Sequence, residues 1–141
     1  MQIKKIITGM LVAVLLLLVV PQVKAQEFMS VAELRPGMQG VARTVITGDT
    51  IEEFDVEILG IMPQQGPTGG SLILIKTSGP LIERTGGIAQ GMSGSPVYID
   101  GKLVGAIAYG WGMTDSTVGM LTPIGEMLKL FDTMAQADAK A

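Results

Sequence analysis

The residue best suited to chemistry in this sequence of 141 residues is Ser93, which lies in the glycine-framed segment 91–96 (GMSGSP). A serine nucleophile needs a tight turn that projects its hydroxyl, and nearby backbone N–H groups that hold the oxyanion formed when it attacks a carbonyl. Gly91 and Gly94 permit such a turn, since glycine adopts backbone conformations that other residues avoid. The pattern predicts Ser93 as a nucleophile, with the N–H groups of Gly91 and Ser93 facing one pocket.

The same composition also suits a plain tight turn without chemistry, and the sequence contains no histidine to take a proton from the serine hydroxyl. A lysine can serve as the base where burial makes its neutral form accessible. Of the candidates Lys76, Lys102 and Lys129, Lys76 is the best placed, because it ends an apolar run that predicts a buried strand. Asp55 and Glu83 are candidates for orienting such a base, although most carboxylates of this kind are solvated at the surface.

The composition also narrows the range of ligands. Without cysteine or histidine there is no disulfide and no metal site built from those residues. The acidic residues are scattered and form no D-x-D-x-D-G calcium loop. The net charge is −3 and no basic cluster follows Ala25, which gives nucleic-acid binding no support. We expect no cofactor, no metal and no nucleic acid.

The N-terminal segment, residues 1–25, is typical of an export signal. Lys4 and Lys5 precede an apolar run over residues 6–20, and Ala25 supplies the small residue at which a signal peptidase cuts. The apolar run is shorter than the roughly 20 residues that usually span a membrane, which favours cleavage over a retained anchor. We expect an exported protein in the periplasm, the cell envelope or the medium, with residues 1–25 as its membrane contact if they are retained.

The elements that must position the serine are mainly strands. Alternating or continuous apolar runs predict strands over residues 40–47, 53–62, 71–76, 97–99, 102–109 and 120–122. Asp100 and Gly101 lie between two of these runs and are a strong hairpin signal. Residues 30–34 predict a short helical turn. Residues 81–91 contain two central glycines and predict a flexible segment that leads to the serine.

A helix is predicted at the C-terminal side of the last strand. Pro123 suits its first turn, and four apolar residues share one face, Ile124, Met127, Leu128 and Phe131. The prediction is therefore a mainly β protein with one domain. It comprises a signal helix over residues 1–25, a β-barrel domain with a short C-terminal helix over residues 26–134, and a disordered tail over residues 135–141.

Several strings of the sequence resemble the SpoIVB-type serine peptidase domain, within the chymotrypsin-like superfamily. They are LRPGMQG, FDVEILG, SGPLIERTGGIAQGMSGSPVYIDGKLVGAIAYGW and GMLTPIGEML, and they cover most of residues 34–128. The resemblance implies one chymotrypsin-like β-barrel, the half of the fold that bears the nucleophile. It also implies Ser93 as the nucleophile position, oxyanion N–H groups from Gly91 and Ser93, and a strand edge at Ala108, Tyr109 and Gly110 that pairs with an extended peptide.

The sequence departs from this family at the catalytic base. SpoIVB-type peptidases use a histidine and an acidic partner ahead of the serine, whereas this sequence has no histidine and too few residues before Ser93 for a complete first barrel. One hypothesis is a serine endopeptidase that is impaired or incomplete, with a base from a lysine, a partner subunit or a companion chain. The other is a pseudoenzyme that binds a peptide or acts as a scaffold. The sequence leaves two questions open: whether the chain is a shortened form of a longer protein, and what its oligomeric state is.

Two aromatic residues near the predicted strand edge allow two interpretations. Tyr109 and Trp111 either line a peptide-binding groove or cap the barrel core. In the first case an extended peptide or protein segment adds to the strand edge by backbone hydrogen bonds, which requires no catalysis.

Overall fold

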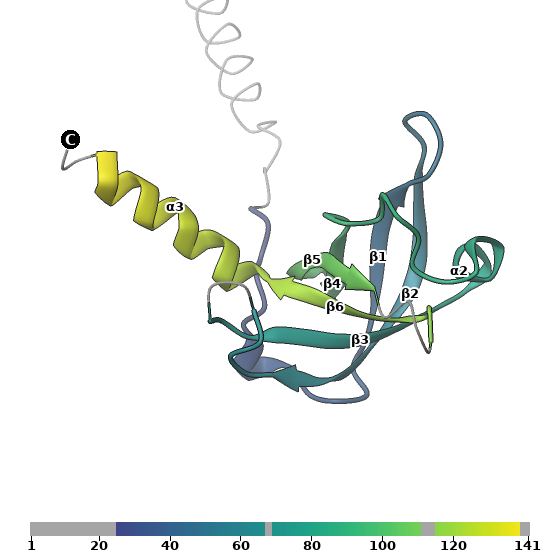
Figure 1. The fold of residues 1–141 in the computed structure, drawn as a ribbon. Helices are drawn as coiled ribbons and strands as arrows, with labels where there is room; N and C mark the ends of the chain where they lie inside the picture. Colours follow the sequence, from purple (N-terminus) through teal and green to yellow (C-terminus); the bar gives the residue numbers. More distant parts are fainter. Residues whose placement is uncertain (1–24, 67–68, 111–114, 139–141) are drawn as a thin grey trace, which may run out of the picture.

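The strands form one closed antiparallel barrel in the order β1-β2-β3-β6-β5-β4 (Figure 1). The structure is a computed structural model that describes residues 25–66, 69–110 and 115–138. The strands are β1 Gln39–Val45, β2 Ile51–Met62, β3 Leu72–Ser78, β4 Pro96–Ile99, β5 Lys102–Gly110 and β6 Val118–Pro123. Each lies at a position where the sequence predicts a strand. The mainly β class, the single barrel and the C-terminal helix are confirmed.

The alternation of apolar and polar residues places one face of each strand in the barrel interior. In β2, Phe54, Val56 and Ile58 are buried, whereas the intervening Asp55 is exposed. Side chains from all parts of the sheet fill the centre, among them Ile58, Ile73, Ile75, Val97, Val104 and Leu121. Burying a side chain of this size contributes about 1.5–3 kcal/mol relative to leaving it exposed. The interior is therefore a packed core, and the functional surface lies on its rim.

The hairpin between β4 and β5 confirms the prediction from Asp100 and Gly101. Both residues have positive φ angles, 50° and 76°, as a two-residue type I′ turn requires. β4 then closes the barrel against β1 through two residue pairs, Val41 with Tyr98 and Ala42 with Val97. Each of the other five strand pairings extends over at least four residue pairs.

The N-terminal part of the described chain joins the barrel through β5. Phe28 pairs with Leu103 in parallel, and the 3-10 helix η1, Val31–Glu33, follows where the sequence predicts a helical turn. The Glu33 carboxylate accepts hydrogen bonds from the backbone N–H and the hydroxyl of Ser30, both at 2.8 Å. These bonds lower the pKa of Glu33, because they favour its charged form. The predicted signal helix lies outside the described residues.

Helix α2, Pro80–Thr85, corrects one prediction, since residues 81–91 were expected to be a flexible approach to the serine. Pro80 stands at the first helical position, where its missing N–H costs nothing, and Leu81 and Ile82 are buried against the barrel. The two glycines that suggested flexibility lie after the helix: Gly86 ends it with a positive φ of 73°.

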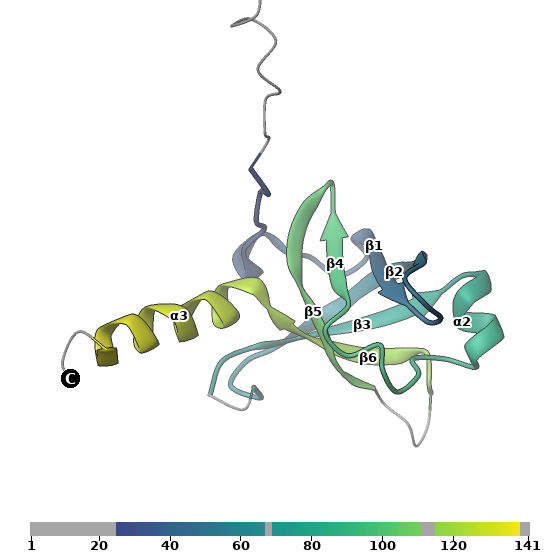
Figure 2. The ribbon, with the colours of Figure 1, turned by 90° about the horizontal axis from the view of Figure 1, so that it is seen from above.

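Helix α3, Ile124–Asp138, starts next to the predicted position and points away from the barrel (Figures 1 and 2). It includes residues 135–138, which the sequence assigned to a disordered tail; residues 139–141 lie outside the described part. Its predicted apolar face is only partly covered, because Leu128 and Phe131 are exposed, and Leu130, outside that face, is exposed as well. Within residues 25–66, 69–110 and 115–138, no helix has the length and hydropathy needed to cross a membrane.

Candidate functional site

Ser93 is exposed at the tip of a turn that the barrel holds from both sides. The residue before it, Met92, is fully buried. The Gly94 N–H donates to the Ile107 carbonyl at 2.7 Å, and the Ser95 N–H donates to the Met92 carbonyl at 3.1 Å. Ser93 is therefore presented to solvent by a turn that is anchored to the core and to β5.

The conformation of the turn explains the glycines around the serine. Gly91 and Gly94 have φ angles of 96° and 88°, in the region where residues with a side chain are strained. Among the described residues, the backbone N–H groups of Gly91 and Ser93 donate to no other group. Both are free to hold an oxyanion, while their predicted convergence on one pocket stays a prediction.

A cleft of about 300 Å³ opens beside the serine. Its walls come from the segment before Ser93, from β5 and from the segment that leads into β6. The lining residues carry no charge and are Ile88, Ala89, Gln90, Ser93, Ile107, Gly110 and Ser116. The walls at Ile88 and Ser116 were not predicted from the sequence, because segments far apart in the chain meet there. Gly87, which has room for no side chain against Ser116, was the available signal.

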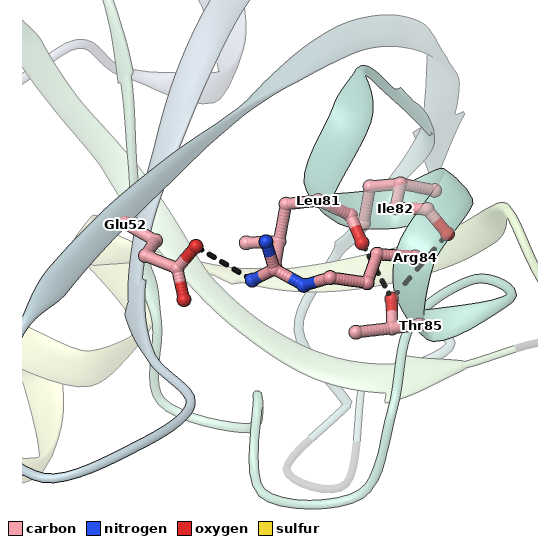
Figure 3. Close-up of polar contacts among 5 residues, drawn as sticks. All are labelled: Glu52, Leu81, Ile82, Arg84 and Thr85. Atoms are coloured by element: carbon pink, nitrogen blue, oxygen red, sulfur yellow. Dashed lines mark hydrogen bonds and ion pairs between the residues drawn. The ribbon is translucent and has the colours of Figure 1, made fainter.

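Figure 3 shows polar contacts of helix α2 with β2 and within the helix, which fix the segment that leads to one wall of the cleft. The Arg84 guanidinium bonds to the Glu52 carboxylate of β2 at 2.6 Å. The Thr85 hydroxyl lies 3.0 Å from the Leu81 carbonyl and 2.7 Å from the carbonyl of Gly87, just beyond the helix. The chain thus leaves α2 in a defined direction and reaches the cleft at residues 88–90.

The strand edge expected to receive a peptide borders the same cleft. Pairing between β4 and β5 ends at Pro96 and Ala106, so the described residues offer no strand partner to residues 108–110 on the β4 side. On their other side Tyr109 and Gly110 pair with β6, after a register irregularity at Ala108. Tyr109 is 43% exposed, which places it at the surface and not in the core. Trp111 lies outside the described residues.

None of the groups considered as a base or its orienting partner lines the cleft. Lys76 is exposed on β3, where it pairs with Glu57 and Val118, and no contact joins it to Ser93 in the described part of the chain. Asp55 and Glu83 are also exposed. The Ser93 hydroxyl has no hydrogen-bond partner among the described residues. The role of Lys76 as a base stays a prediction that no contact supports.

A buried pair of hydroxyls ties the serine turn to β1. The Ser95 hydroxyl donates to that of Thr44 at 2.9 Å, and the two residues are 7% and 5% exposed. Ser95 therefore has a structural role. Thr44 was missed, since nothing in the sequence pairs a residue of β1 with the turn 51 residues later.

Asp115 holds the third wall of the cleft in place. Its carboxylate accepts hydrogen bonds from the hydroxyl and the backbone N–H of Thr117, at 2.6 and 2.9 Å. These two bonds, with a smaller contribution from the charge of Lys76, lower the pKa of Asp115 below its ordinary 3.8. A lowered pKa means that this carboxylate stabilises the fold above about pH 3.8 and ceases to do so as the pH falls through its folded pKa.

A titration of Asp115 is expected to show this lowered value. In an NMR pH titration its carboxyl signal should have a midpoint below 3.8 in the wild type. The midpoint should rise toward 3.8 in Thr117→Val, because one of the two donors is removed. A wild-type midpoint at or above 3.8 would contradict the assignment of these hydrogen bonds.

Comparisons with known proteins place the whole barrel in one family. The family model described as SpoIVB peptidase S55 matches residues 17–128, which include every strand, the serine turn and the start of α3. A search of curated proteins found no match to the chain.

Proposed function

The chain belongs to the SpoIVB peptidase S55 family, and we propose that it is an exported member that binds an extended peptide beside Ser93 without activating this serine by itself. Its domain is a SpoIVB-like peptidase domain. The proposal concerns what this particular domain does with the peptide.

One observation carries the proposal: Ser93 projects from an intact turn, but its hydroxyl meets no base in the part of the chain that the structure describes. The 141 residues contain no histidine, and the cleft is lined by uncharged residues. A serine hydroxyl is a poor nucleophile until a neighbouring base takes its proton. In enzymes of this type, loss of triad members leaves only about 10³–10⁴-fold acceleration over water. We therefore expect peptide cleavage by the isolated chain to be severely impaired.

Several features of the cleft support the proposed peptide binding, however. Among the described residues, the edge of β5 at residues 108–110 has no strand partner on its β4 side, and it borders the cleft that contains Ser93. A peptide that pairs with this edge gains backbone hydrogen bonds and places a side chain beside the cleft. The N–H groups of Gly91 and Ser93 are available for a carbonyl or a carboxylate of that peptide.

A second candidate function is a peptidase completed by another chain. The exposed position of Ser93 favours it, because a base on a partner subunit or a companion chain has direct access to the hydroxyl. This candidate shares the binding step with the first and differs only in whether the serine becomes activated.

Export rests on the segment over residues 1–25. Lys4 and Lys5, the apolar run over residues 6–20 and the small residue Ala25 have the order of a signal peptide. Cleavage after Ala25 would release the described domain outside the cytoplasm.

Mass spectrometry tests two parts of the proposal, export and the lack of serine activation. The protein, expressed with its own N-terminus and purified from the secreted or membrane fractions, is measured intact before and after treatment with a fluorophosphonate probe. We expect the untreated mass to correspond to a chain that begins at Gln26. We expect no adduct under conditions that label a serine protease with a complete triad, for the wild type and Ser93→Ala alike.

Each alternative result has a defined meaning. A stoichiometric adduct on Ser93 that is absent in Ser93→Ala would refute the lack of activation in the isolated chain. An adduct that forms only after addition of an extract of the producing cells would favour the second candidate, a partner-supplied base. An intact mass that retains residues 1–25 would contradict cleavage.

A further inference from the structure

We propose that Ile88 sets the depth of the cleft beside Ser93, so that the site prefers a peptide with a short aliphatic side chain, such as valine, over one with a charged or aromatic side chain. This inference rests on the proposed peptide binding and specifies which peptides are bound.

The side chain of Ile88 lines the cleft and extends toward both β5 and β6. A Cβ placed on Gly110 would lie 3.9 Å from Cβ and Cγ2 of Ile88, and a Cβ placed on Gly119 would overlap its Cδ1. Ile88 therefore fits between two strand residues, in β5 and β6, that have no side chains. The aliphatic group of Ile88 occupies space that a long ligand side chain would otherwise enter.

Hydrogen bonds join the two walls of the cleft that contain Ile88 and Ser116. The Ile88 N–H donates to the Ser116 carbonyl at 2.7 Å, and the Ser116 hydroxyl donates to the Gly86 carbonyl at 2.6 Å. Gly87 approaches Ser116 so closely that even one added carbon would overlap it. The two walls thus meet, and a ligand cannot deepen the cleft without breaking these hydrogen bonds.

The lining also selects against charge. Ile88, Ala89 and Ile107 are apolar, and Gln90, Ser93 and Ser116 are neutral. A charged side chain placed there would lose hydration without gaining an ion pair, which is unfavourable. An aliphatic side chain gains from leaving water, in proportion to the apolar area that becomes buried.

Binding of short peptides tests this preference. The probes are fluorescein-labelled tetrapeptides with three alanines and a variable last residue, valine, phenylalanine, lysine or glutamate, each with a free C-terminal carboxylate. The carboxylate suits the free N–H groups of Gly91 and Ser93. Fluorescence anisotropy with wild-type protein should give a Kd for the valine peptide about tenfold or more below those of the others, since small differences in pocket fit change affinity by about 10–200-fold.

Two variants alter the cleft in opposite directions. Ile88→Ala removes the aliphatic group that lines it and should reverse the preference between the valine and the phenylalanine peptides. Gly110→Val adds a side chain toward Ile88 from the rim, where a Cβ is 3.9 Å away, and should weaken binding of the valine peptide at least tenfold. Gly110 has no positive φ, so this variant keeps the test valid if Ile88→Ala unfolds. Ile51→Ala, a matched truncation at a residue that is 66% exposed on β2, is the control and should leave all affinities unchanged.

The outcomes separate the two proposals. If the folded protein binds none of the four peptides, the proposed peptide binding fails, and this inference with it. If it binds all four within threefold, or prefers lysine, glutamate or phenylalanine, peptide binding stands and the role of Ile88 is overturned. A valine preference that Gly110→Val leaves intact would also overturn it.

Discussion

Met92→Ala is expected to lower the free energy of unfolding by about 2–5 kcal/mol, the range observed when large apolar side chains are truncated in packed cores. Met92 is fully buried and belongs to the barrel core, although it stands directly before the exposed Ser93. Its sulfur also lies 3.4 Å from the Ala89 N–H, within the turn. Since a domain of this kind is stable by only about 5–15 kcal/mol, the loss is a large share of the total. Urea denaturation followed by circular dichroism measures it.

Met92→Leu is the matched control for this prediction. Leucine has a similar volume and is expected to cost less than about 1.5 kcal/mol, because a volume-conserving replacement leaves little cavity. If Met92→Ala and Met92→Leu had the same midpoint in urea as the wild type, Met92 would not anchor the serine turn in the core.

Thr44→Val is expected to destabilise the protein by about 1–3 kcal/mol, because it leaves the buried Ser95 hydroxyl without its partner. Valine has nearly the shape of threonine, so packing is little changed. The lost interaction also frees the serine turn from β1. The measurement is the free energy of unfolding from urea titration.

The double variant Thr44→Val/Ser95→Ala separates this effect from a loss of packing. With both hydroxyls removed, no buried donor is left unsatisfied, and replacement of both partners is nearly neutral in many proteins. The double variant should therefore be closer to the wild type in stability than Thr44→Val alone. Strict additivity of the two single changes would show that the hydroxyls do not interact.

The strands were predictable because their pattern is local. The alternation in β2 and the Asp100-Gly101 turn are visible within a few residues, and the structure contains both. The errors also have local causes. Gly86 and Gly87 suggested a flexible segment, whereas Gly86 ends helix α2 and Gly87 fits against Ser116. A glycine indicates that the backbone at its position has an unusual conformation or a close neighbour, but it does not indicate whether the backbone is mobile there.

The site was predictable only where its residues are close together in the sequence. Gly91, Ser93 and Gly94 lie close together in the sequence, and the turn that they predicted is present. The cleft, in contrast, depends on contacts between distant segments, such as the hydrogen bond from Ile88 to Ser116. Such contacts follow from how the barrel closes, and no pattern within one segment reveals them.

The short pairing between β1 and β4 has a consequence for the serine turn. The boundary between β1 and β4 is held by only two residue pairs, so we expect it to open more easily than the other five. β4 begins shortly after Ser93, at Pro96, so opening at this boundary would separate the segment that presents the serine from β1, while its hydrogen bonds to Ile107 of β5 stay formed. The local stability of the site therefore depends on the short pairing between β1 and β4. The hydrogen bond between Ser95 and Thr44 lies beside this pairing and also joins the serine turn to β1.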